Sequence, residues 1–353
     1  MFARKPGLHI NLVTKRPNFF YHLHPPTIPA EQARYRYTFG LGGLAVFLFI
    51  VVSISGALLL FYYIPSAEKA NESLQIITYH VPLGWLVRNL HYWGTQALVI
   101  ISRLHLLRVI FTGGSRIPRR FNWLLGFGLL LLLLGLNFSG YVLRWDVDIG
   151  WALLVGTNLL KEIPIFGEGL YSLVVGGSEI SDGTVLRFFG WHVFGLLIPA
   201  AFLFGWHLFR VRRDGGISRP KPKPGKRAAR IDRETLFQRE IVAIFIAGAI
   251  LFILSVIFNP GLASKLDPTK IIGEASAPWF FLWIQELLRW GNPFWMGVLI
   301  PLVLLVLLGL LPYAFDRGTE GGRWFPRDGR RAQMLALGII LLIVLLTIVG
   351  ALR

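Results

Sequence analysis

Long apolar runs recur along this 353-residue chain and constrain its fold more than any other feature. A helix of about 20 apolar residues crosses the hydrocarbon core of a bilayer. Helices and closed barrels alone satisfy backbone hydrogen bonds there. With 54% hydrophobic residues, the chain is neither an ordinary soluble globule nor a disordered protein. The sequence predicts an all-α polytopic membrane protein with seven transmembrane helices, at about 38–63, 80–111, 122–143, 185–211, 237–259, 293–315 and 332–352.

The net charge of +17 comes from 36 Lys and Arg residues, most of which fall between the spans. If the N-terminus is inside, the inner segments and span ends hold 25 of them and the outer ones hold 8. An excess of Lys and Arg marks cytoplasmic loops, so we expect a cytoplasmic N-terminus. This distribution suits anionic headgroups of membrane lipids, and we expect no nucleic-acid partner.

A stretch rich in Pro, Gly and basic residues, "RRDGGISRPKPKPGKRAARIDR", divides the chain. We interpret 212–236 as a basic linker between a four-helix part, 38–211, and a three-helix C-terminal part, 237–353. Residues 1–37 form an N-terminal segment on the cytoplasmic side, without the apolar core of a signal peptide. The outer segment 144–184 is long for a loop, and its apolar pieces near 149–160 and 169–176 predict short helices at the membrane face.

Two spans each carry a pair of histidines, His91 and His105 in the second and His192 and His207 in the fourth. Ionisable groups inside spans are costly and usually functional. The separations of 14 and 15 residues place the members of each pair about 21–22 Å apart on nearly one helix face. Both spans run from outside to inside, so His91 is level with His192 and His105 with His207. Isolated polar helix contacts are the alternative, but facing imidazoles suit haem iron.

The sequence therefore predicts two non-covalent b-type haems, one between His91 and His192 in the outer half and one between His105 and His207 in the inner half. Cysteine is absent, so we expect no covalent haem on this chain.

Two pairs of glycines repeat the histidine spacing. Gly42 and Gly56 lie in the first span, and Gly126 and Gly140 lie in the third, each pair fourteen residues apart. A missing side chain allows close approach, so we expect these glycines to make room for the two macrocycles.

Two arginines lie one helical turn from a histidine. Arg88 is outward of His91, and Arg108 is inward of His105. Each is expected near a haem propionate, to which a guanidinium donates charge-assisted hydrogen bonds. The alternative for both is snorkelling to an interface.

These features resemble the cytochrome b subunit of Rieske–cytochrome b complexes, the quinol–cytochrome c or plastocyanin oxidoreductases. Similarity runs from about residue 30 to the C-terminus. The C-terminal part is similar to the small three-span subunit of the chloroplast-type complex, here joined to the first part. The matching stretches are "FGLGG", "WLVRNLHYW", "RLHLLRVIFTGG", "LNFSGYVLRWD", "TVLRFFGWHVF", "IFNPG", "PWFFLWIQELLR" and "WFPRDGRR".

The resemblance implies a four-helix diheme bundle joined to three further helices. It also implies a subunit that oxidises quinol near the outer face, sending one electron to a Rieske iron–sulfur protein and the other through both haems to an inner quinone site. The implied partners are that Rieske protein, a c-type cytochrome subunit and a second copy of the complex, in a prokaryotic cytoplasmic membrane. One alternative is a diheme, quinone-reactive anchor of another respiratory oxidoreductase. A transporter is the other.

The outer quinol site departs from the family pattern. Relatives carry Pro-Glu-Trp-Tyr where this chain has Ala277-Pro278-Trp279-Phe280, so the family's proton-accepting carboxylate is missing. Glu286 is the candidate replacement because it is acidic in an apolar, membrane-proximal segment, and Glu274 is the reserve. Pairing of Glu286 with Arg289, three residues on, is the alternative.

The resemblance places Trp145, Pro278 and Phe281 at this quinol site. Arg144 stands where relatives usually have Pro, which could reshape the roof of the site. Gly40 occupies the place of a Cys that tethers an additional haem in chloroplast-type relatives, so a simpler inner quinone site is expected.

Overall fold

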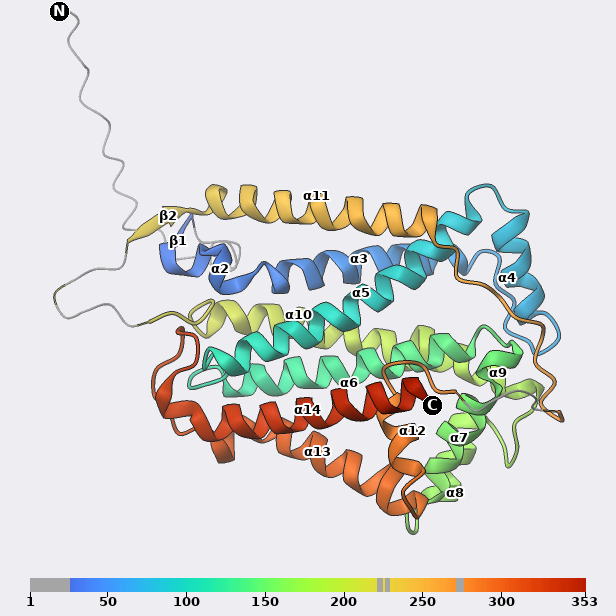
Figure 1. The fold of residues 1–353 in the computed structure, drawn as a ribbon. Coiled ribbons are helices and arrows are strands. Elements are labelled where there is room, and N and C mark those ends of the chain that lie inside the picture. Colours follow the sequence, from blue (N-terminus) through green and yellow to red (C-terminus); the bar gives the residue numbers. More distant parts are fainter. Residues whose placement is uncertain (1–25, 221–224, 226–228, 271–275) are drawn as a thin grey trace, which may run out of the picture.

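The computed structural model describes residues 26–220, 225, 229–270 and 276–353, and its long helices lie side by side (Figure 1). Six helical stretches are long and apolar enough to cross a membrane. These are Leu41–Leu59 (α3), Gly84–Phe111 (α5), Arg120–Val142 (α6), Asp182–Arg213, Arg233–Ile257 (α11) and Arg327–Leu352. A shorter apolar helix covers Phe294–Gly309. The chain is thus an all-α membrane protein with six long apolar helices and one shorter helix.

Several of these stretches are composite. Asp182–Arg213 comprises α9 (Asp182–Gly190), a π-helical segment (Trp191–Leu196) and α10 (Leu197–Arg213). The last stretch begins with a 3₁₀ turn, Arg327–Gly329, followed by α14 (Arg330–Leu352). The predicted run 293–315 corresponds to a π-helical segment (Phe294–Leu299), α13 (Ile300–Gly309) and another π-helical segment (Leu311–Phe315).

The N-terminal four-helix part is built from two close helix pairs, α3 against α5 and α6 against α10. α11 packs across α3 and α5, with Leu48, Leu98 and Leu251 buried where the three meet. α14 contacts α5, and a buried cluster that includes Ile110 of α5 and Ala336 of α14 joins the two parts of the chain. Burial of these apolar faces determines which helices pack against each other in the bundle.

One end of the bundle carries the short elements of the long outer segment (Figure 1). The predicted helices near 149–160 and 169–176 are confirmed as α7 (Gly150–Lys161) and α8 (Gly167–Val175). Two further helices, α4 (Ala70–Tyr79) and α12 (Leu282–Leu288), were not predicted from the sequence.

At the opposite end, a small antiparallel sheet joins the N-terminal segment to the linker. β1 (Thr27–Pro29) pairs with β2 (Arg230–Asp232), with Ile28 opposite Ile231. Two short helical turns follow β1, the 3₁₀ turn Ala30–Ala33 and α2 (Tyr35–Thr38). Three-residue strands are too short for an alternating pattern, so the sequence could not predict them. The loops between α5 and α6 and between α13 and α14 also lie at this end. They carry basic residues such as Arg116 and Arg323, so we call it the basic end.

Candidate functional site

His91 of α5 and His192, in the π-helical segment before α10, face each other inside the bundle. Their ring centroids are 6.4 Å apart and their planes are inclined at 69°. A metal–imidazole bond is about 2 Å long, so two rings sharing one metal ion must have centres roughly 6 Å apart. The observed separation fits an iron atom between them, with a porphyrin supplying the remaining ligands.

The hydrogen bonds at Nδ1 fix the tautomer of three of the histidines. Nδ1 of His91 lies 3.0 Å from the Val52 carbonyl oxygen, and Nδ1 of His207 lies 3.2 Å from that of Asn122. A carbonyl only accepts, so each Nδ1 donates its proton. Nδ1 of His192 lies 3.0 Å from Oγ of Ser139, whose own hydroxyl donates to the Leu136 carbonyl. These bonds leave Nε2 of each ring free to bind a metal ion.

Each of the four predicted glycines lies against one of the four imidazoles. A Cβ at Gly56 would be 2.9 Å from Cε1 of His91, and one at Gly140 would be 2.9 Å from Cε1 of His192. At the inner level, the same distance is 3.0 Å for Gly126 and His207 and 3.6 Å for Gly42 and His105. The glycines therefore make room for the imidazoles themselves, where the sequence had suggested room for the macrocycles.

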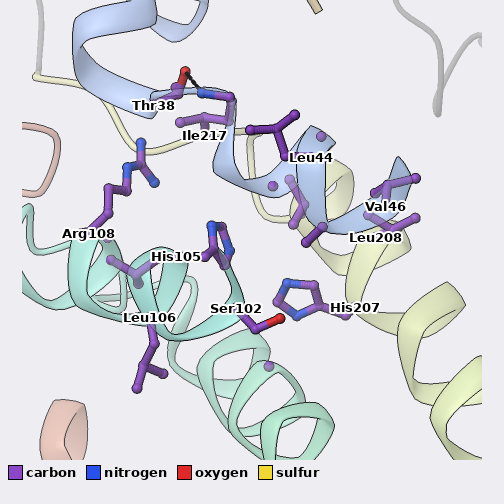
Figure 2. A pocket seen from close by; sticks show the side chains of 18 of the residues that line it. Thr38, Leu44, Val46, Ser102, His105, Leu106, Arg108, His207, Leu208 and Ile217 are labelled. Carbon is purple, nitrogen blue, oxygen red and sulfur yellow. Dashed lines mark hydrogen bonds between the residues drawn. The ribbon is translucent and has the colours of Figure 1, made fainter. Parts of the chain in front are cut away.

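The inner histidines line a cavity of about 470 Å³ between α3, α5, α6 and α10. Figure 2 shows the rings of His105 and His207 pointing toward one another, with Arg108 farther along the same wall. Gly42 and Gly126 also line this cavity. We call it the inner cavity. Its walls are mainly apolar, as a non-covalently held porphyrin requires.

Arg108 and Arg88 have different surroundings. Arg108 is buried beside the inner cavity, where its guanidinium lies 4.3 Å from the ring centroid of Tyr37 and Nε donates to the Tyr37 carbonyl. Its Nη2 has no partner among the described residues, so a donor is left for an anionic group. Arg88 instead donates to the Pro260 carbonyl at 2.8 Å and approaches Asn259 Oδ1 at 3.4 Å. The fit to a haem propionate is therefore better at Arg108.

A second cavity, of about 230 Å³, lies at the end opposite the basic end. We call it the outer cavity. Pro278 and Phe281 line it, together with Gln285 of α12 and apolar side chains of α7 such as Val155 and Leu159. Trp279 points elsewhere: its Nε1 donates to Gln96 Oε1 at 2.7 Å, and Arg103 lies 4.9 Å from its ring centroid.

Glu286 is fully buried but is not among the residues that line the outer cavity. Its carboxylate accepts from Trp290 Nε1 at 3.2 Å and from Arg353 Nη1 at 3.2 Å, and Arg289 Nη1 lies 3.5 Å away. This geometry favours the alternative left open by the sequence, pairing with Arg289, and adds the C-terminal Arg353. Glu274 lies outside the described residues.

Trp145 is a core residue. It is fully buried with Val142, Leu153 and Val185, and it is not among the residues that line the outer cavity. Its carbonyl accepts from Leu266 N at 3.0 Å, and the backbone of the next residue, Asp146, forms an isolated antiparallel β-bridge with that of Lys265. The Trp145 segment thus joins the two parts of the chain.

Arg144 contacts Asp146, and its Nη2 also lies 3.2 Å from Asp148. Burial raises the pKa of Asp146, and the Arg144 charge opposes that rise. Arg144 therefore shapes the loop above α6 through these carboxylates.

Two serines belong to the site although the sequence analysis did not single them out. Ser55 Oγ lies 3.2 Å from His91 Nδ1, and Ser139 Oγ lies 3.0 Å from His192 Nδ1. Each directly precedes one of the outer-level glycines, Gly56 and Gly140. The signal that could have revealed them is this repeated Ser-Gly pair, in which glycine admits the ring and serine orients it.

These observations define a class: a helical membrane protein whose bundle holds paired imidazoles at two depths. Comparison with known proteins places the chain in a family of this class. The model of the family "Cytochrome b/b6/petB" matches residues 29–215. The chain belongs to the cytochrome b/b6 family.

Individual relatives cover the same N-terminal region. The cytochrome b6 of Heliomicrobium gestii is 38% identical over 183 residues, which are 52% of this chain and 85% of that protein. The menaquinol:cytochrome c reductase cytochrome b subunit of Geobacillus thermodenitrificans is 36% identical over 186 residues, 52% of this chain and 82% of that protein.

Similarity of fold extends to the C-terminal part. A structure described as a hyperthermophilic respiratory Complex III matches with a TM-score of 0.72 and 25% identity. The match covers 89% of this chain and 91% of the chain in that structure. A cytochrome b fold therefore spans both parts.

Proposed function

We propose that this chain is the cytochrome b subunit of a quinol:cytochrome c-type oxidoreductase and transfers electrons across a prokaryotic cytoplasmic membrane. The observation that carries the proposal is the pair of facing imidazoles, His91 and His192, at the separation that one iron atom requires. The similarity to a menaquinol:cytochrome c reductase subunit supports the same activity.

Two b-type haems are proposed, held by His91 with His192 and by His105 with His207. When bound, they would supply one-electron carriers at two depths in the bilayer. The chain's own contribution is to fix the imidazoles. Nδ1 of His91 and His207 donates to backbone carbonyls, which orients each ring and raises its basicity as a ligand. Arg108 Nη2 is the donor for an inner propionate.

The outer cavity is the proposed quinol-oxidation site. Its walls are mainly apolar. Pro278 belongs to the segment that replaces the family's Pro-Glu-Trp-Tyr, and Phe281 directly follows that segment. An apolar pocket with a few polar groups suits a quinol ring and its tail. None of the described lining residues is acidic, and Glu286 is turned toward Arg353. The quinol proton would therefore leave through a group other than Glu286.

Seven spans and two parts are proposed for the chain in the membrane. The shorter helix Phe294–Gly309, continued by Leu311–Phe315, is the proposed sixth span. The basic end is assigned to the cytoplasm, because loops rich in Lys and Arg remain there. Residues 38–211 form the proposed diheme part and residues 237–353 the three-helix part, joined by the linker 212–236.

The proposed partners are a Rieske iron–sulfur protein and a c-type cytochrome subunit, in a homodimeric complex. Affinity purification of the tagged full-length chain from its native membrane tests this. We expect a Rieske protein, identified by its iron–sulfur electron paramagnetic resonance signal, and quinol-dependent reduction of a soluble c-type cytochrome. Recovery of a hydrogenase or formate dehydrogenase, without a Rieske centre, would instead support the alternative of a diheme membrane anchor.

A further inference from the structure

Arg103 is a cation within the membrane-spanning helix α5, on the face opposite the proposed haem ligands. At about 100° per residue, Gln96, Ile100 and Arg103 are directed away from His91 and His105. They are not among the described residues that line the inner or the outer cavity. An ionisable side chain inside a span is costly and usually marks function. Arg103 therefore has a role separate from both cavities.

The contacts of Arg103 differ from those of the other arginines of α5. Its guanidinium carbon lies 4.9 Å from the ring centroid of Trp279. Within the described residues, the guanidinium has neither a hydrogen bond nor an ion pair within 4 Å. Arg88 and Arg108, by contrast, each donate to a backbone carbonyl. The face of an indole offsets part of the cost of a charge in the membrane, but it leaves the N–H donors of Arg103 without an oxygen acceptor.

The depth of Arg103 and the direction of its side chain exclude a lipid headgroup as its partner. Arg103 lies eight residues before Phe111, the last residue of α5, about 12 Å along the helix from the basic end. Side chains of a helix lean toward its N-terminus, so the guanidinium is directed toward the centre of the bilayer. The position of Trp279 agrees, because its Nε1 donates to Gln96, seven residues nearer the N-terminus than Arg103. The side chain therefore does not snorkel to the basic end, where the phosphates of the lipids lie.

The residues beside Arg103 leave this face of α5 open to the membrane. Ile100 is 47% exposed and Leu104 is 44% exposed. Trp279 is 37% exposed, so the open surface continues from α5 onto the segment before α12. We call Gln96, Ile100, Arg103, Leu104 and Trp279 the α5 surface. It combines apolar side chains with one positive charge, and its complement is an apolar helix that carries one carboxylate.

We propose that the α5 surface binds a transmembrane helix of another subunit, and that Arg103 pairs there with an Asp or Glu at its own depth. This inference rests on the proposed function, which places the chain in a complex with partner subunits. Lipid tails are as apolar as helix side chains, so polar contacts contribute strongly to the choice of helix partners in a membrane. An ion pair neutralises the guanidinium, whereas a neutral ligand such as quinone would leave the charge of Arg103 uncompensated.

The test replaces Ile100 with the photo-crosslinking residue p-benzoylphenylalanine in the full-length chain, within its native membrane. Irradiation followed by mass spectrometry identifies what lies against the α5 surface. We expect a peptide from a transmembrane helix of another subunit, with an Asp or Glu inside its span. Removing one member of a buried charge pair weakens binding strongly, so Arg103→Leu should lower the crosslinked fraction roughly tenfold. The matched control Arg103→Lys keeps the charge and should keep most of the crosslink.

A charge swap tests the ion pair itself. Arg103→Glu should lose the crosslink and regain it when the carboxylate of the crosslinked helix is replaced by Arg, which a purely structural role of Arg103 would not give. Crosslinks to lipid alone, to a second copy of this chain or to a helix without an acidic residue would overturn the inference. An unchanged crosslink in Arg103→Leu would overturn it too, and so would loss of haem absorption in that variant, which would assign Arg103 to the stability of the bundle. A wild-type complex without b-type haem would instead refute the proposed function.

Discussion

At the level of single residues, the fit between a glycine and an imidazole decides how each histidine is held. The fit is tight at Gly56, Gly126 and Gly140, where a Cβ would lie 2.9–3.0 Å from a ring carbon. At Gly42 the corresponding distance of 3.6 Å is an ordinary van der Waals contact. At the three tight positions the ring cannot move away without losing its Nδ1 hydrogen bond. A methyl group in place of the glycine hydrogen should therefore be tolerated at Gly42 only.

Gly56→Ala should therefore displace His91 and weaken haem binding at the outer level. Overpacking of this kind costs about 1–3 kcal/mol, so we expect at least half of the outer haem to be lost on purification. Gly42→Ala is the matched control and should retain both haems. The measurement is the haem content per polypeptide from pyridine haemochrome spectra. Equal haem contents in the two variants would contradict the proposed role of the glycine.

Glu286 gives a second prediction at this scale. Its buried carboxylate accepts from Arg353 and Trp290, so Glu286→Gln should loosen the C-terminal helix. Loss of charge-assisted hydrogen bonds to a buried group costs about 1–3 kcal/mol, and we expect a lower melting temperature in both Glu286→Gln and Arg353→Leu. Reduction of the haems by quinol should stay near the wild-type rate. A selective loss of that reduction in Glu286→Gln would restore the sequence-based assignment of Glu286 as proton acceptor.

At the level of elements, the length of the apolar runs and the spacing of the histidines were the most useful features for predicting the helices. They were sufficient for the six long helices and for α7 and α8, because burial in lipid and in helix interfaces depends on composition along a whole segment. The orientation of α12 was not predictable. Glu286 and Gln285 are neighbours in sequence, yet only Gln285 lines the outer cavity, since the packing of α12 against α14 decides which face is turned inward.

Residues 276–278 and Phe281 line the outer cavity, and Trp279 of the same segment contacts α5. Trp279 donates to Gln96 and lies beneath the guanidinium of Arg103. If this contact positions the quinol site, Gln96→Leu should raise the KM for quinol about fivefold, the equivalent of one lost hydrogen bond of about 1 kcal/mol. Haem spectra should not change.

Thr95→Val is the control for Gln96→Leu. Thr95 is the preceding residue on α5, and its hydroxyl donates to the Tyr92 carbonyl instead of contacting Trp279. We expect a wild-type KM in this variant. A similar rise of KM in both variants would mean that the effect comes from α5 in general and not from the Trp279 contact.

At the level of the whole molecule, a buried ion cluster fastens the two parts of the chain at the basic end. Nε of Arg116 lies 2.9 Å from both carboxylate oxygens of Asp316, and Arg116 Nη2 lies 3.0 Å from Asp328. Arg116 and Asp316 are almost completely buried. In the sequence, Arg116 is one basic residue among many in the loops. Its role could not be predicted, because the partners are about 200 positions away along the chain.

Removing one partner of a buried ion pair costs about 3–5 kcal/mol, because the other charge stays buried without compensation. Arg116→Leu should therefore lower stability strongly and separate the C-terminal part from the N-terminal part in detergent. The double variant Arg116→Leu/Asp316→Leu should recover part of the loss, since neither charge is left alone. The measurement is thermal unfolding of the purified protein. A double variant less stable than Arg116→Leu would contradict this explanation.

We propose above all that α5 and the helical stretch Asp182–Arg213 hold iron porphyrins between imidazoles at two depths. The most direct test is an optical redox titration of the purified wild-type protein and of His91→Ala. We expect two b-type haems in the wild type, and in His91→Ala one haem with the inner site intact. A wild-type protein with one haem or none, or a His91→Ala variant that keeps both, would contradict the pairing of His91 with His192 and of His105 with His207.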